Sequence, residues 1–86
     1  MKQGVFYRLE TFDGQELGFF LDGLYRDKMF SDLPPTAEVH SGGRVFSLST
    51  HKVEAVITDL TYERISDGFK LRLVEVGPAD AVAPAE

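Results

Sequence analysis

Apolar and polar residues alternate in short runs along most of the chain. The alternation has the two-residue period of a β-strand, and the runs are separated by turn-forming pairs such as Asp13-Gly14, Gly42-Gly43 and Asp67-Gly68. This pattern predicts five to six short antiparallel strands, arranged as a small barrel or a strongly bent sheet. The chain is therefore mainly β, with α+β at the margin.

The Asp67-Gly68 pair predicts the best-defined hairpin. Asp-Gly between two β-rich runs favours a two-residue turn, because such a turn needs positive φ at both central residues. The resulting register pairs Tyr62 with Leu73 and Arg64 with Leu71. One face of the hairpin is then apolar and carries Leu60, Tyr62, Phe69, Leu71 and Leu73.

The first Asp-Gly pair requires a choice between two registers. A two-residue turn would pair Leu9 with Gly18 and mix polar and apolar groups on both faces. A three-residue loop instead pairs Leu9 with Phe19 and separates the faces, so we predict that register. The face opposite the core then carries Phe6, Phe12 and Phe20 together with Arg8 and Glu10.

Three phenylalanines on this second face exceed the apolar content of an ordinary solvent-exposed face. Three explanations remain open. A short helix or closure of the barrel covers Phe6 and Phe20, another subunit or a partner protein covers them, or the face forms a ligand groove. We predict an interface at Phe6, Phe12, Phe20, Arg8 and Glu10, with a homodimer as its first occupant and another protein as a possible partner.

Two segments depart from the strand pattern. Apolar residues recur at helical spacing between Leu24 and Leu33, and Pro34-Pro35 follows, which predicts one short helix around residues 23–33. From Gly77 onward the chain has small residues, two prolines and no periodic apolar face. We expect residues 1–76 to form a single domain and residues 77–86 a disordered C-terminal tail.

The composition narrows the class of function. The 86 residues include no cysteine, which excludes disulfides and thiolate chemistry and favours a cytoplasmic location. Nine basic against 14 acidic residues give a net charge of −5, so we expect no nucleic-acid partner. No apolar run reaches membrane length, and we expect no membrane partner.

Acidic residues gather around the first hairpin. Asp13, Glu16 and Asp22 do not have the spacing of a calcium loop, so we predict an acidic patch and no metal site. An alternative function follows from this patch: with Glu10, these acids would make an inhibitor or regulator that occupies a basic site on a partner protein.

The two histidines, His40 and His51, lie beside polar segments. No nucleophile, base and orienting group share a recognisable spacing, so we expect a binding or interaction domain without catalytic activity and without a cofactor. A second alternative is a small-ligand-binding or hydrolytic protein whose pocket lies near His40 or His51.

Overall fold

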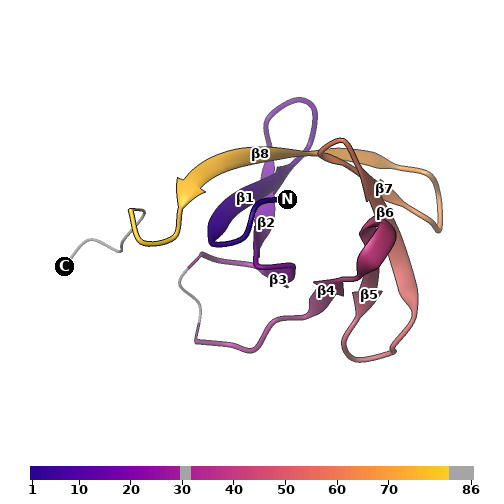
Figure 1. Cartoon of the computed structure of the whole chain (residues 1–86). Helices are drawn as coiled ribbons and strands as arrows, with labels where there is room; N and C mark the ends of the chain where they lie inside the picture. Colours follow the sequence, from indigo (N-terminus) through magenta and orange to yellow (C-terminus); the bar gives the residue numbers. More distant parts are fainter. Residues whose placement is uncertain (30–31, 82–86) are drawn as a thin grey trace.

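The computed structural model describes residues 1–29 and 32–81 and shows a closed antiparallel barrel of eight strands in sequence order (Figure 1). The 3₁₀ helix η1 (Ser41–Gly43) joins the fourth and fifth strands. The strands are β1 (Val5–Glu10), β2 (Glu16–Leu21), β3 (Leu24–Arg26), β4 (Ala37–Val39), β5 (Arg44–Ser47), β6 (Val53–Thr58), β7 (Thr61–Arg64) and β8 (Lys70–Pro78).

The predicted barrel is confirmed, although it contains more strands than the five to six expected. Two of the eight, β3 and β4, are only three residues long. Segments of that length show too little alternation to be read as strands from the sequence. Closure of β8 on β1 leaves the barrel without an open sheet edge.

The helix predicted around residues 23–33 is wrong in its first part, which is β3. Tyr25 pairs with Phe20 on one side and with Ala37 on the other, so the backbone groups of β3 are bonded within the sheet. The remaining described residues of the segment form bends and turns, and residues 30 and 31 lie outside the described residues. Strand pairing here outweighs the helical spacing.

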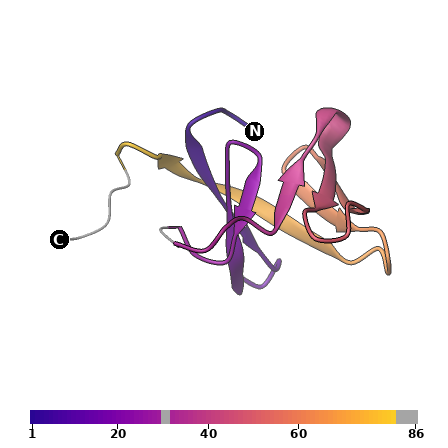
Figure 2. The same ribbon diagram turned by 90° about the horizontal axis from the view of Figure 1, so that it is seen from below.

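The two ends of the barrel differ in their connections. Because successive strands are antiparallel, the connections alternate between the ends. The longer ones, residues 11–15, 27–36, 48–52 and 65–69, define what we call the long-loop end. The shorter ones, residues 22–23, 40–43 and 59–60, define the short-turn end together with the N-terminus. Figure 2 shows the N-terminus and η1 on one side and the β7–β8 loop on the other.

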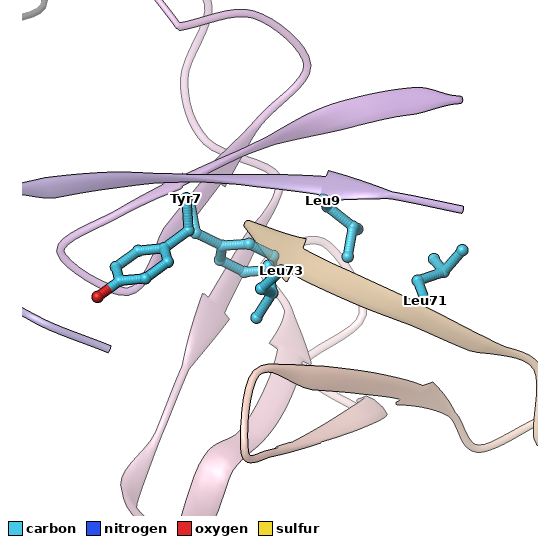
Figure 3. Close-up of a cluster of buried hydrophobic side chains, with 5 residues drawn as sticks. Tyr7, Leu9, Leu71 and Leu73 are labelled. Carbon is cyan, nitrogen blue, oxygen red and sulfur yellow. The ribbon is translucent and has the colours of Figure 1, made fainter. Parts of the chain in front are cut away.

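Side chains of the inward-facing positions fill the barrel. One buried cluster combines Tyr7 and Leu9 of β1 with Leu71 and Leu73 of β8 (Figure 3), and Phe20 of β2 belongs to the same cluster. A second cluster consists of Ala37, Val45 and Ala55. An eight-stranded barrel is just wide enough for its side chains to fill, and here small residues on one side complement large ones on the other.

The predicted register of the first hairpin is wrong. Tyr7 pairs with Phe20 and Leu9 pairs with Gly18, which is the pairing of the rejected two-residue turn. The loop that accompanies it is longer, and the N–H of Thr11 donates to the carbonyl of Gln15 at 2.9 Å. A bulge next to Glu10 lets this longer loop coexist with that pairing.

The second hairpin has its predicted apolar face but a different register. Tyr62 pairs with Leu71 rather than with Leu73, so the register differs by two residues and each side chain keeps its face. The loop is wider than a two-residue turn, because the N–H of Arg64 donates to the carbonyl of Phe69 at 2.9 Å. Two residues of that apolar face are exposed all the same, Phe69 at 48% and Leu60 at 41%, so only Tyr62, Leu71 and Leu73 pack inside the barrel.

The boundary predicted at Gly77 lies inside β8. Gly77 and Pro78 pair with Phe6 and Val5 of β1, so the sheet extends two residues further than expected. The described residues after Pro78 form a turn, and residues 82–86 of the predicted tail lie outside the described residues.

Candidate functional site

Two β-bulges shape the long-loop end. In β2, Glu16 lies opposite Glu10 and Gly18 lies opposite Leu9, so Leu17 between them is the extra residue. In β6, Ala55 lies opposite Val45 and Val53 lies opposite Phe46, so Glu54 between them is the extra residue. A bulge breaks the alternation of faces and re-aims a side chain, and bulges are common at barrel rims and binding sites. Leu17 and Glu54 both line the same cavity.

This cavity enters the barrel from the long-loop end and has a volume of about 200 Å³. Its inner part is formed by buried core residues such as Phe20 and Val45. Its outer part is formed by Leu17, Tyr25, Thr36, Glu54, Tyr62 and Arg64. Two hollows at the short-turn end lie beside Met1 and Val39, but no aromatic side chain lines them.

Three aromatic rings surround the cavity. The ring of Phe20 lies 5.1 Å from that of Tyr25 at 56°, and 6.4 Å from that of Tyr62 at 46°. Tyr25 lies across Gly18, where a Cβ atom would overlap the tyrosine ring, and its hydroxyl donates to the carbonyl of Leu17 at 3.2 Å. Because Gly18 has no side chain, it leaves room for the Tyr25 ring, which forms one wall of the cavity.

The tyrosine hydroxyls remain protonated at neutral pH. Burial, followed by the nearby Glu54 carboxylate, raises the pKa of Tyr62 to about 12. Burial also raises the pKa of Tyr25, with smaller contributions from Asp27 and Glu54. Both tyrosines thus present neutral hydroxyls, and the negative charge at the cavity belongs to carboxylates.

The charge of Arg64 is balanced within its own loop. Its Nε and one terminal nitrogen donate to the two carboxylate oxygens of Asp67 at 2.9 and 2.6 Å. These bonds lower the pKa of Asp67 to about 2. Glu54, in contrast, makes no ion pair with any side chain among the described residues. The rim of the cavity therefore combines a guanidinium that is already paired with a carboxylate that has no ion pair among the described residues.

The predicted face of Phe6, Phe12 and Phe20 is not formed. Phe20 points into the barrel and is 1% exposed, because the one-residue difference in register moves it to the other face of β2. Phe6 is 3% exposed, so the chain itself covers both residues. Only Phe12, in the β1–β2 loop, is exposed, at 59%. The intramolecular explanation holds for Phe6 and Phe20.

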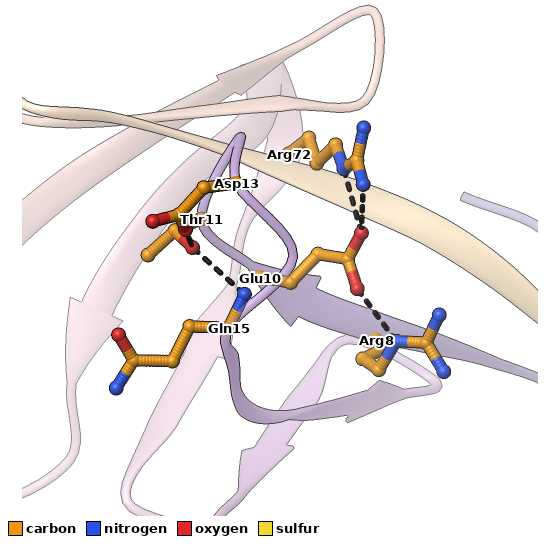
Figure 4. A network of polar contacts seen from close by, with 6 residues as sticks. All are labelled: Arg8, Glu10, Thr11, Asp13, Gln15 and Arg72. Atoms are coloured by element: carbon orange, nitrogen blue, oxygen red, sulfur yellow. Dashed lines mark hydrogen bonds and ion pairs between the residues drawn. The ribbon is translucent and has the colours of Figure 1, made fainter.

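The charged residues of that predicted interface form an internal network on the outer wall (Figure 4). The Glu10 carboxylate accepts from Nε of Arg8 at 2.8 Å and from Nε of Arg72 at 2.6 Å. The two guanidinium groups cover it, and Glu10 is 3% exposed. The hydrogen bond from Arg8, together with Arg72, lowers the pKa of Glu10 from its ordinary value of 4.5, although desolvation opposes the shift.

This network should make the stability of the barrel depend on acid pH. Because the pKa of Glu10 is lowered in the folded state, its stabilisation is complete above pH 4.5 and is lost as the pH falls through the folded-state pKa. We expect Glu10→Gln to be less stable than the wild type at pH 7 and to lose less stability between pH 7 and pH 3. Urea unfolding at the two pH values measures both effects.

Glu16→Gln is the matched control, since Glu16 lies opposite Glu10 but is exposed. This variant should keep the wild-type dependence on pH. An identical pH dependence in Glu10→Gln and the wild type would contradict the stabilising role of the network.

The residues of the predicted acidic patch are divided between the two ends of the barrel. Asp13 accepts a hydrogen bond from Thr11 in the β1–β2 loop, and Glu16 begins β2 at the same end. Asp22 lies in the β2–β3 turn at the opposite end, where its carboxylate accepts from the N–H of Gly4 at 2.6 Å. With Glu10 bonded to two arginines, these four acids do not form a single surface.

Neither histidine belongs to the lining of the cavity. His40 is exposed, contacts Glu38 at 2.8 Å and lies against the ring of Phe46 at 4.3 Å. His51 is exposed in the β5–β6 loop. Neither residue lines the cavity, which contradicts the pocket predicted near His40 or His51. Two residues of the cavity are not identified by the sequence pattern. The pattern places Tyr25 in a helix. Glu54 interrupts an apolar run, and this interruption is the one sequence signal of the bulge.

The described part of the chain contains no assembled metal site. Residues 1–29 and 32–81 contain no group of three or more His, Asp or Glu placed to hold a metal ion. In the same residues no helix has the length and apolar character to cross a membrane. No protein-family model, curated protein or solved structure matches this chain.

Proposed function

We propose that the chain is a non-catalytic binding domain that takes its ligand at the long-loop end of the barrel. One observation carries this proposal: most of the exposed apolar side chains lie at the end of the barrel that also contains the cavity, and one of them, Leu17, lines it. Five of the seven large hydrophobic side chains exposed among the described residues belong to this end: Phe12, Leu17, Leu33, Ile65 and Phe69.

This distribution differs from that of an ordinary protein surface. Single exposed apolar residues are common and need no explanation, whereas several around one cavity are typical of binding sites. The mouths of β-barrels are also frequent ligand sites. The volume of about 200 Å³ is below that of pockets for drug-sized molecules, which begin at about 300 Å³. The cavity therefore suits a small molecule or one side chain of a partner.

A small neutral alcohol, 3,3-dimethylbutan-1-ol, tests the proposal. We expect it to bind with a dissociation constant of about 1 mM, because its branched apolar group fits a fragment-sized cavity. Backbone amide chemical shifts should change in residues of the long-loop end and not in the β2–β3 and β6–β7 turns. Titration followed by ¹H–¹⁵N NMR measures both the affinity and the place of binding.

Two matched variants complete the test. Thr36→Phe places a ring at the wall of the cavity and should abolish binding. Thr58→Phe makes the same change at an exposed threonine near the short-turn end and should leave binding intact. Shift changes that do not saturate, or that persist in Thr36→Phe, would contradict a site at the long-loop end.

Self-association is a second candidate, favoured by two exposed aromatic residues at the same end. Phe12 is 59% and Phe69 48% exposed, and aromatic residues are enriched at protein interfaces. In this form of the proposal the homodimer contact involves Phe12 but neither Phe6 nor Phe20. A cytoplasmic location belongs to the proposal as well and is supported by the absence of cysteine.

A further inference from the structure

The three rings at the cavity have the arrangement of an aromatic cage. Phe20 lies at the base, and Tyr25 and Tyr62 are tilted from it by 56° and 46° as two walls. The faces of aromatic rings are electronegative and attract a cation that lies within about 6 Å of the ring centroid. Tyr25 and Tyr62 are only partly buried and both line the cavity, so their rings can contact one small group, while the buried Phe20 ring supports them from beneath.

A carboxylate without a partner lies at the rim of this cage. Glu54 lines the cavity and acts electrostatically on both tyrosines, yet none of the ion pairs among the described residues includes it. Arg64 also lines the cavity, but its charge is balanced by the bidentate contact with Asp67. A cation in the cavity would therefore meet an unpaired negative charge.

We infer that the cavity binds an alkylated ammonium group, held by the rings of Tyr25 and Tyr62, with Phe20 packed beneath them, and by the carboxylate of Glu54. This inference rests on the proposed binding function and specifies its ligand.

The lining of the cavity favours an alkylated ammonium group over one that carries N–H donors. An ammonium with three N–H donors is strongly hydrated and needs acceptors to replace its water. The cavity wall contains Leu9, Leu17 and Val45 besides the rings, and the Tyr25 hydroxyl already donates to a backbone carbonyl. A trimethylammonium group has no N–H donors and favours apolar and aromatic surroundings. Its chemistry matches what surrounds the cavity.

Choline and 3,3-dimethylbutan-1-ol form a pair of equal shape for the experiment, because the alcohol has carbon in place of the charged nitrogen. We expect choline to bind the wild-type protein at least about tenfold more tightly, since only choline gains the attraction of the rings and of Glu54. NMR titration of the full chain with both compounds measures the ratio.

The two titrations separate this inference from the proposed function. If both compounds bind at the long-loop end with equal affinity, the ammonium inference is overturned while the binding proposal stands. If neither compound binds, the binding proposal itself fails. A clear preference for choline at the residues of the cavity supports both.

Glu54→Gln tests the carboxylate within the wild-type cage. This variant should reduce the affinity for choline towards that for the neutral alcohol and leave the alcohol unaffected. Glu63→Gln removes the same charge from the outer wall of β7 and should change neither affinity. Unchanged choline binding in Glu54→Gln would overturn the assignment of the carboxylate.

Two sources of the group can be compared directly. A trimethylammonium group occurs in small choline-like molecules and in the trimethylated side chain of lysine. N-acetyl-trimethyllysine-methylamide represents the second source, and its backbone would lie outside the cavity at the long-loop end. Tighter binding of this compound than of choline assigns the cavity to a peptide side chain, and the reverse order assigns it to a small molecule.

Discussion

Phe20→Glu should prevent the chain from folding at room temperature. Phe20 is 1% exposed and lies in the interior cluster with Tyr7, Leu9, Leu71 and Leu73. Loss of a buried phenylalanine ring costs about 3–5 kcal/mol, and an unpaired buried carboxylate adds several more. A domain of this size has a total stability near or below about 5 kcal/mol, so the substitution exceeds it.

Circular dichroism and urea unfolding check this result, with Phe12→Glu as the control. Phe12 is 59% exposed in the β1–β2 loop, and its substitution should change the free energy of unfolding by no more than about 0.5 kcal/mol. A folded Phe20→Glu protein with wild-type stability would contradict the position of Phe20 inside the barrel.

Sedimentation of wild-type and Phe12→Glu protein also tests self-association, since a dimer through Phe12 should dissociate in the variant.

The contrast between these two phenylalanines shows how far the sequence pattern reaches. Alternation within a strand correctly places Tyr7 and Leu9 of β1, and Leu71 and Leu73 of β8, on the inner face. It does not fix the register between β1 and β2, because that depends on the length of the loop and on the bulge at Leu17. A one-residue difference in register moves Phe20 from a predicted surface into the core.

The cavity was not predictable for a related reason. Its lining residues come from all eight strands, and these residues converge only because the barrel closes. Tyr25 lies in a strand of three residues, and Glu54 faces the cavity through a bulge that departs from the alternation. Local patterns indicate strands and turns, but they do not indicate which side chains converge across a closed barrel.

Gly43→Ala should be the most damaging of the conservative glycine substitutions. Gly43 ends η1 with φ of +79°, a conformation that costs other residues about 1–2 kcal/mol. A Cβ atom at this position would also overlap the backbone carbonyl oxygen of Ile57 in β6. Because β6 is paired with both β5 and β7, that carbonyl cannot move without disturbing the sheet.

We expect Gly43→Ala to lower the free energy of unfolding by about 2–5 kcal/mol, as the sum of the backbone term and the overpacking term. The adjacent Gly42 provides a close control, since its φ is +83° and nothing lies within 4 Å of the position of its Cβ atom. Gly42→Ala should therefore show the backbone cost alone, about 1–2 kcal/mol. Urea unfolding gives the free energy of unfolding of both variants, and the difference between the two losses is the contribution of the contact between η1 and β6. Equal losses would show that this contact does not constrain the barrel.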